Sequence, residues 1–481
     1  MTATLTAPPA APASADAGHP RRWLILFVVL AAECMDLLDA TIVNVAAPSI
    51  RADLGASLSA LQWVVGGYSL AFAVGLITGG RLGDMYGRRK LFLIGAAGFT
   101  AASVLCGAVQ SPGMLIATRL AQGAFGALLI PQGFGIIKQV FPPDELPKAF
   151  GLFGPVMGMA ALASPIIGGG LVDADLFGTG WRMVFLVNLP LGGLALLGAV
   201  RVLPESRAAV KPKLDLPGMA LITVAAAALM YPLIQGREEG WPTWMYASMV
   251  AGVALLGGFG FYIRARSRAG GDPLVLPSIF RRRAFSGGLV VGLVSLSSIM
   301  GLLLVFTLYL QLGLGFSAIH AGLTLIPFSL FVAVGAGMSG GFLAAKFGRP
   351  VITAGLLVLV AGVVAMIATV HGETTVTSWD VVPPQILLGL GFGLFVAPYF
   401  DTVLAAVDDD EVGSASGTLN AIQQLGGATG VAALGTLFFS VLPKHGFGTA
   451  FEHTLWLSAG LLAVSVALSF ILPRWAREPV L

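Results

Sequence analysis

The feature that most constrains this chain is a series of apolar stretches, each about 20 residues long and nearly free of charged side chains. A helix of that length matches the hydrocarbon thickness of a bilayer. The stretches lie near residues 23–47, 60–80, 91–110, 113–137, 149–171, 183–203, 217–235, 246–263, 285–309, 320–344, 351–371, 382–406, 413–441 and 454–473. The sequence therefore predicts an all-α integral membrane protein with fourteen transmembrane helices.

The composition of the chain supports a membrane location. Only 11% of the 481 residues are charged and 56% are hydrophobic, whereas soluble proteins carry about 25% charged residues. Too few charges are present to cover a water-exposed surface, which excludes a soluble enzyme, a nucleic-acid binder and a disordered protein. Both cysteines, Cys34 and Cys106, fall in apolar stretches, so we expect no disulfide framework, metal site or cofactor.

The distribution of basic residues predicts the topology. Fourteen spans place both termini on one side, and Lys and Arg accumulate on the cytoplasmic side of membrane proteins. Most of the 27 basic residues fall in segments on the same side as the termini. Only Arg51, Arg182, Arg237 and Lys444 fall on the opposite side, and Arg119 lies inside a span. Both termini are therefore predicted to be cytoplasmic. Residues 1–20 lack an apolar core and are expected to form a disordered tail rather than a signal peptide, and residues 475–481 a second tail.

An internal repeat predicts the domain organisation. The segment GRLGDMYGR at residues 80–88 recurs in degraded form as GFLAAKFGR at residues 341–349, an offset of 261. Each copy closes the second stretch of a group of six, and repeated halves are common in transporters. We expect six-helix bundles at residues 21–204 and 282–474, separated by two inserted helices at residues 215–267.

Several motifs together resemble the major facilitator superfamily, in particular its branch of fourteen-helix drug:proton antiporters. They are GRLGDMYGRRK at residues 80–90, LIATRLAQGAFG at 115–126, LDATIVNVA at 38–46 and WRMVFLVNLP at 181–190. The fifth stretch matches the family's antiporter motif, except that Ala160 and Ser164 replace two of its glycines. That departure weakens the preference for antiport over symport. The resemblance runs from Arg21 over nearly the whole chain.

The resemblance implies which residues control the conformational change. The loop after the second span would latch the outward-facing state, and a tight turn there needs glycine. The kinked, closely packed fifth span would contribute to the same gating. The expected gating residues are Gly80, Gly83, Asp84, Gly87, Arg88, Pro165, Gly168 and Gly169.

Charged residues inside the spans predict a proton-coupling site. Glu33, Asp36 and Asp39 are three residues apart and share one broad helical face. Three such carboxylates cannot all ionise easily, so at least one is expected to carry a proton near neutral pH. Arg119 costs about 2.5–3.5 kcal/mol within a span and needs either a partner or a route to the interface. We expect proton coupling at Asp39 first, then Asp36 and Glu33, with Arg119.

Uncharged polar side chains in the spans predict the kind of substrate. An apolar chamber with few polar groups suits a bulky lipophilic molecule better than a sugar. Candidate substrate-binding residues are Asn44, Gln122, Tyr309, Gln311, Asn420 and Gln424, although amides in spans also serve as hydrogen-bond partners between helices.

Together these observations predict a proton-coupled antiporter that exports lipophilic drugs or antibiotics across the cytoplasmic membrane by alternating access. The alternatives are a dedicated metabolite exporter and a monovalent-cation/proton exchanger of the same fold. We expect no enzyme activity. An intramembrane enzyme would need a paired acidic or His-based site at the membrane face, whereas the five histidines of this chain are scattered over the tail and the predicted external ends of spans. The expected partners are a small lipophilic substrate, protons and the lipid bilayer, without nucleic acid, and the chain is expected to function as a monomer.

Overall fold

A computed structural model describes residues 18–142, 145–205, 214–372, 376–407 and 411–475, and these residues form helices and loops without a strand. The predicted tails at residues 1–20 and 475–481 fall largely outside the described residues. The helices are α1 (Arg22–Leu54), α2 (Leu58–Tyr86), α3 (Arg88–Ala108), α4 (Pro112–Val140), α5 (Leu146–Gly151), α6 (Phe153–Ala174), η1 (Leu176–Gly178), η2 (Gly180–Arg182), α7 (Met183–Leu186), α8 (Asn188–Val202), α9 (Leu216–Gln235), α10 (Thr243–Arg268), η3 (Ile279–Arg281), α11 (Arg283–Leu308), η4 (Tyr309–Gly313), α12 (Ala318–Thr324), α13 (Ile326–Met338), η5 (Ser339–Leu343), α14 (Ala344–Phe347), α15 (Arg349–Val370), α16 (Val382–Leu404) and α17 (Val412–Ser469).

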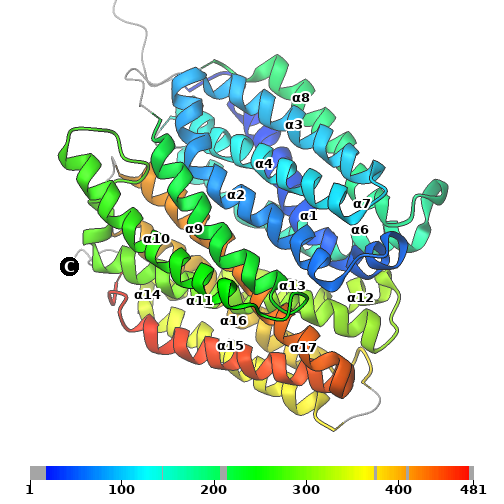
Figure 1. Cartoon of the computed structure of the whole chain (residues 1–481). Helices are drawn as coiled ribbons and strands as arrows, with labels where there is room; N and C mark the ends of the chain where they lie inside the picture. The colour runs from blue at the N-terminus through cyan, green and yellow to red at the C-terminus, as the bar shows by residue number, and fades with distance from the viewer. Residues whose placement is uncertain (1–17, 143–144, 206–213, 373–375, 408–410, 476–481) are drawn as a thin grey trace, which may run out of the picture.

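The last two predicted spans are joined more closely than the sequence indicated. In place of a loop between residues 441 and 454, α17 remains helical on both sides of Gly446, where φ is 79° and ψ is 177°. Glycine adopts positive φ without a steric penalty, so the chain reverses there within a single residue. The orange and red arms of α17 in Figure 1 are the two predicted spans.

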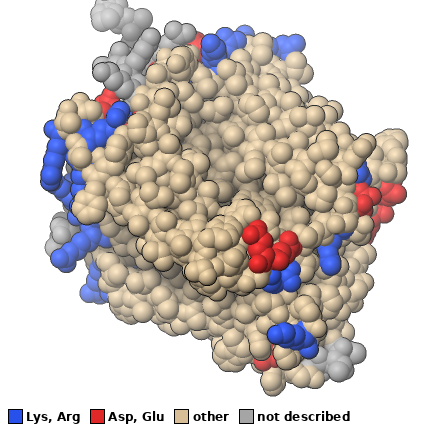
Figure 2. All heavy atoms as spheres, in the orientation of Figure 1, with Lys and Arg blue, Asp and Glu red and all other residues tan. Residues whose placement is uncertain are grey.

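Twelve helical segments of the described residues are long and apolar enough to cross a membrane. α1 is not among them, since it contains Glu33, Asp36 and Asp39, and the two arms of α17 count as one segment. Large apolar side chains such as Val250, at 70% exposure, point outward. Figure 2 shows a mostly uncharged face, with Lys and Arg gathered along its upper and left margins and smaller groups of charged side chains near the middle, at the right and at the bottom. A large uncharged area is expected of a surface covered by lipid. The number fourteen and the orientation of the termini remain predictions.

The helices pack into two bundles (Figure 1), with α1 to α8 in blue through cyan to blue-green above and α11 to α17 in light green to red below. The inserted helices α9 and α10 pack on each other, and α9 also contacts both α2 and α17. Leu70, Met230 and Ala428 belong to a small apolar cluster at this three-helix contact. The insertion therefore covers one seam between the bundles.

A carboxylate fixes the start of the insertion. Asp215 is fully buried at the N-terminus of α9, where its oxygens accept hydrogen bonds from Gly218 N (3.1 Å), Leu274 N (2.8 Å) and the Tyr262 hydroxyl. Arg266 adds an ion pair at 3.5 Å. Asp215 thus ties α9, α10 and the segment preceding α11 together.

The repeat found in the sequence corresponds to a structural repeat. Gly87 (φ 108°) and Gly348 (φ 65°) each end one helix and start the next, and both have positive φ. The arginines that follow them act alike: Arg88 donates to the carbonyl of Gly135 (2.8 Å) and Arg349 to that of Phe470 (3.1 Å). Each turn is therefore held against a neighbouring helix of its own bundle.

Hydrogen bonds join the two bundles near one end, which we call the distal end because it is opposite the start of α1 and the end of α17. Gln62 Nε2 donates to the carbonyls of Val431 (3.1 Å) and Ala432 (3.0 Å) on α17. Asp173, at the end of α6, accepts from the backbone nitrogens of Ala318 (3.2 Å) and Ile319 (3.0 Å). These bonds hold the bundles together at the distal end.

Candidate functional site

An ion pair lies inside the first bundle. Arg119 Nη1 on α4 donates to Asp39 Oδ2 on α1 at 2.5 Å, and the two side chains are 1% and 0% exposed. Arg119 Nε also donates to the carbonyl of Val64 on α2 at 3.2 Å. The structure therefore gives Arg119 a buried partner, and the alternative that its side chain reaches the interface is wrong.

Neutral polar groups surround the Asp39 carboxylate. Asp39 Oδ1 accepts from Gln122 Nε2 (2.8 Å) and Asn188 Nδ2 (2.7 Å). Ser103 Oγ accepts from the same two amides at 3.2 and 2.9 Å, and it donates to the carbonyl of Phe185 at 2.9 Å. These groups come from α3, α4, α7 and α8, so one carboxylate on α1 is bonded to much of the bundle.

The other two acids of α1 are placed differently from Asp39. Asp36 and Glu33 are both half-buried, one and two turns toward the end where the chain begins. Asp36 Oδ1 accepts a hydrogen bond from the Tyr68 hydroxyl on α2. Glu33 Oε1 is buried without a hydrogen-bond partner in the described residues. Two half-buried acids of α1 thus lie on one side of a fully buried ion pair.

This arrangement has a definite chemical capacity. A buried ion pair is stable only while both charges are present, because an unpaired charge in a low-dielectric interior is costly. Protonation of the carboxylate would release Arg119, and loss of the proton would recapture it. The site can therefore exchange a proton for a cationic partner without covalent chemistry.

Three of the predicted substrate-binding residues are engaged within the protein. Gln122 is fully buried, and its Oε1 accepts from Arg119 at 2.8 Å, so the structure places it in the ion-pair network rather than on a chamber wall. Tyr309 is buried, with its ring stacked 4.5 Å from that of Phe451. Gln311 Nε2 donates to the carbonyl of Val45 at 2.8 Å and so joins the two bundles.

The other three predicted substrate-binding residues remain available. Asn44 on α1 is half-buried, and its Oδ1 has no hydrogen-bond partner in the described part of the chain. Asn420 and Gln424 are half-buried and one turn apart on α17. These three amides are the candidates left for contact with a ligand.

The predicted gating residues after α2 form a compact turn. Asp84 Oδ1 accepts from Arg88 Nη2 at 2.9 Å, and Arg88 also reaches the Gly135 carbonyl on α4. Gly80 packs toward Pro131, and a Cβ on Gly83 would collide with the Gln132 side chain. Gly87 supplies the positive φ described above. The turn therefore binds α2 and α3 to α4.

The predicted gating residues of the fifth span lie at a contact between the bundles. A Cβ on Gly169 would lie 2.5 Å from the Cα of Ile319 on α12, and the Pro165 carbonyl lies against Gly322. Gly168 packs within its own bundle, where a Cβ would lie 2.6 Å from Ile42 Cγ1 on α1. The small residues of α6 thus permit close approach to both α1 and α12.

Sequence reasoning missed Asn188, which is a direct partner of Asp39, Ser103, which accepts from the Gln122 and Asn188 amides, and the role of Tyr68. A signal was present, because all three are polar residues within or beside apolar stretches. The pairing itself could not be read, since Asn188 lies 149 residues from Asp39 along the chain.

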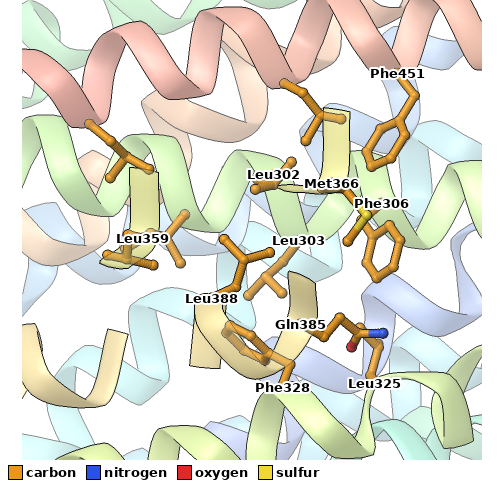
Figure 3. Close-up of a pocket in the computed structure, with 13 residues that line it drawn as sticks. Leu302, Leu303, Phe306, Leu325, Phe328, Leu359, Met366, Gln385, Leu388 and Phe451 are labelled. Atoms are coloured by element: carbon orange, nitrogen blue, oxygen red, sulfur yellow. The ribbon is translucent and has the colours of Figure 1, made fainter. Parts of the chain in front are cut away.

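The cavity in Figure 3 lies inside the second bundle, away from the ion pair. It is lined by aliphatic and aromatic side chains and by Gln385, and its volume is about 30 Å³. That volume holds about one or two water molecules, whereas drug sites measure roughly 300–1,000 Å³. No cluster of three His, Cys, Asp or Glu side chains that could hold a metal ion occurs in the described residues.

Comparisons with known proteins agree with this fold. A family model described as the Major Facilitator Superfamily matches residues 29–431. In shape the chain is similar to a D-xylose-proton symporter (TM-score 0.66, 15% identity, covering 94% of this chain and 98% of the other). It is also similar to a bacterial homologue of the human lysosomal transporter Spinster (TM-score 0.65, 16% identity, covering 94% and 96%).

Relatives of higher sequence identity occur among curated proteins. The chain is 52% identical over 449 residues to a probable actinorhodin transporter of Streptomyces coelicolor, covering 91% of this chain and 78% of the relative. It is 36% identical to the puromycin resistance protein pur8 of Streptomyces alboniger, covering 97% and 94%. It is 37% identical to the tetracenomycin C resistance and export protein of Streptomyces glaucescens, covering 89% and 78%. The chain therefore belongs to the major facilitator superfamily and is a multi-pass membrane transporter.

Proposed function

We propose that this transporter exports a lipophilic antibiotic across the cytoplasmic membrane in exchange for protons. The observation that carries the proposal is the buried ion pair of Asp39 and Arg119, with Asp36 and Glu33 half-buried on the same helix. Ionisable groups inside a membrane are costly and are retained at ion and proton pathways. Asp39, Asp36, Glu33 and Arg119 are the proposed proton-coupling residues.

The relatives support an antibiotic as the substrate. The names of three of them refer to actinorhodin, puromycin and tetracenomycin C, and a fourth, 33% identical over 94% of this chain, is a cephamycin export protein of Amycolatopsis lactamdurans. The substrate residues proposed here are the half-buried amides Asn44, Asn420 and Gln424. Few polar groups among many apolar ones favour a lipophilic molecule.

Transport proceeds by alternating access of the two bundles through fourteen spans, with both termini in the cytoplasm. In that orientation the distal end is external, and the bonds from Gln62 and Asp173 close the external side. Opening that side requires these bonds to break and the contact of Gly169 and Pro165 with α12 to separate. The turn of Asp84, Gly87 and Arg88 lies at the opposite, cytoplasmic end.

The energy of the proton gradient limits how far a substrate can be concentrated. One proton that enters the cell across a membrane potential of 100 mV releases about 2.3 kcal/mol, and a pH difference of one unit adds about 1.4 kcal/mol. Together they sustain roughly a 500-fold gradient of a neutral substrate. A monovalent cation exported against one proton gains nothing from the voltage, so its effective export requires at least two protons.

The test uses everted membrane vesicles with an acidic interior and a panel of cationic, neutral and anionic lipophilic antibiotics. We expect at least one antibiotic to accumulate in the vesicles and to leak out when a protonophore collapses the gradient. Accumulation that persists without a proton gradient would contradict proton coupling. Failure of the whole panel, combined with transport of one cellular metabolite or of K⁺, would favour the dedicated exporter or the cation/proton exchanger.

A further inference from the structure

We propose that Tyr68 links Asp36, one of the two half-buried acids of α1, to the buried ion pair of Asp39 and Arg119, and is a positioning residue of the proton exchange. The inference rests on the proposed function, because it assigns a role within the same site. It starts from the position of Tyr68, whose hydroxyl and ring touch two different parts of the site.

The hydroxyl of Tyr68 contacts Asp36, the half-buried acid one turn before Asp39 on α1. The side chain is buried, and its hydroxyl donates a hydrogen bond to Asp36 Oδ1. A hydrogen bond to an ionised carboxylate is stronger than one to a neutral group. The charge on Asp36 therefore determines how firmly the hydroxyl is held.

The ring of Tyr68 contacts Arg119, the basic partner in the buried ion pair. The guanidinium carbon of Arg119 lies 4.1 Å from the ring centroid, within the range of a cation–π interaction. Arg119 Nε also donates to the carbonyl of Val64, one turn earlier on α2. The same helix therefore holds the guanidinium at two points, and one of them is the ring whose hydroxyl binds Asp36.

Tight packing makes Tyr68 a stiff connection. Its ring centroid lies 6.0 Å from that of Phe72 and 6.5 Å from that of Phe99. A Cβ on Gly123 of α4 would lie 3.1 Å from the backbone carbonyl carbon of Tyr68, so the backbones of α2 and α4 are in close contact there. A change at the hydroxyl therefore cannot be absorbed by free movement of the ring.

The ionisable groups around Tyr68 and the ion-pair network come from three helices. α1 supplies Glu33, Asp36 and Asp39, α4 supplies Arg119, and α3 supplies Cys106, whose Sγ is 3.6 Å from Gln122 Oε1. When Asp36 is ionised, the hydroxyl and ring are fixed and Arg119 is held against Asp39. When Asp36 binds a proton, this hold weakens, so the two acids bind protons as a linked pair.

The test compares Tyr68→Phe with wild type in proteoliposomes, by following antibiotic-evoked proton release as a function of pH. Phe keeps the ring under Arg119 and removes only the hydroxyl. Loss of that bond from the ionised carboxylate should move the midpoint of the profile to higher pH by about one unit. Tyr399→Phe is the matched control, because it removes a buried hydroxyl that donates to the Gly288 carbonyl (3.0 Å) in the other bundle.

The outcomes separate this inference from the proposed function. Wild type without any antibiotic-evoked proton release would overturn the proposed function itself. Proton release by wild type with an unshifted profile for Tyr68→Phe, or an equal shift for Tyr399→Phe, would overturn the role of Tyr68.

A second variant keeps the inference testable if Tyr68→Phe does not fold. For Asp36→Asn alone, which leaves Tyr68 in place, the proposal expects a flattened pH profile, and a profile that matches wild type would contradict it. Where Tyr68→Phe does fold, its addition to Asp36→Asn should cause no further shift, since the carboxylate that the hydroxyl binds is absent.

Discussion

Replacement of Asp39 by Asn is expected to destabilise the first bundle by about 3 kcal/mol. The carboxylate is 0% exposed and lies 2.5 Å from Arg119, which is 1% exposed. Removal of one partner of a buried ion pair typically costs about 3–5 kcal/mol, since the other charge stays buried without compensation. Asn keeps one acceptor for the amides of Gln122 and Asn188, which places the cost at the lower end of that range.

The decisive comparison is a double-mutant cycle. Arg119→Gln should cost a similar amount, whereas the double variant Asp39→Asn/Arg119→Gln buries no charge. We expect the double variant to be more stable than the sum of the single effects by about 2 kcal/mol or more. Unfolding of the purified protein in mixed detergent micelles, followed by tryptophan fluorescence, measures the three differences. Additive effects within about 0.5 kcal/mol would refute the ion pair as the source of the cost.

Three further predictions concern the fold and its stability. Asp215→Asn should lower the stability by about 1–3 kcal/mol in the same unfolding assay, because a buried acceptor of several hydrogen bonds is weakened; an unchanged midpoint would contradict its anchoring role. Gly391→Ala should destabilise by about 1–3 kcal/mol, since its Cβ would lie 2.6 Å from a backbone nitrogen of α15, whereas Gly337→Ala has open space and should be neutral. Hydrogen bonds from Trp181 and Arg182 lower the pKa of Asp53 below its ordinary 3.8. The stability difference between wild type and Asp53→Asn should therefore exist above about pH 4 and disappear as the pH falls below that value, and a pH-independent difference would argue against the pairing.

The helical character of the apolar stretches was predictable because it follows directly from hydropathy, although the stretches at residues 149–171, 183–203 and 320–344 are each divided between two or more helices. The repeat was also predictable, and Gly87 and Gly348 show why: both supply the same positive-φ turn. The bend at Gly446 was not, because nothing in the local sequence distinguishes a one-residue reversal from a loop.

The charged residues of the site could be predicted from the sequence, but the polar side chains that bind them could not. Asp39 and Arg119 stood out because charges inside a span require compensation. Gln122 was assigned to the substrate, since the sequence does not reveal whether an amide faces a ligand or another helix. Asn188 was missed for the same reason, because its contact with Asp39 depends on how α1 and α8 pack.

The most direct test of the account measures proton release in response to antibiotic, in proteoliposomes with an acidic interior, for wild type and Asp39→Asn. Asp53→Asn is the matched control, because it is the same substitution on the same helix, at an exposed acid paired with Arg182 at 2.7 Å. We expect wild type and Asp53→Asn to release protons when the antibiotic is added, and Asp39→Asn to release none. Undiminished release by Asp39→Asn would show that the buried ion pair does not couple protons to export.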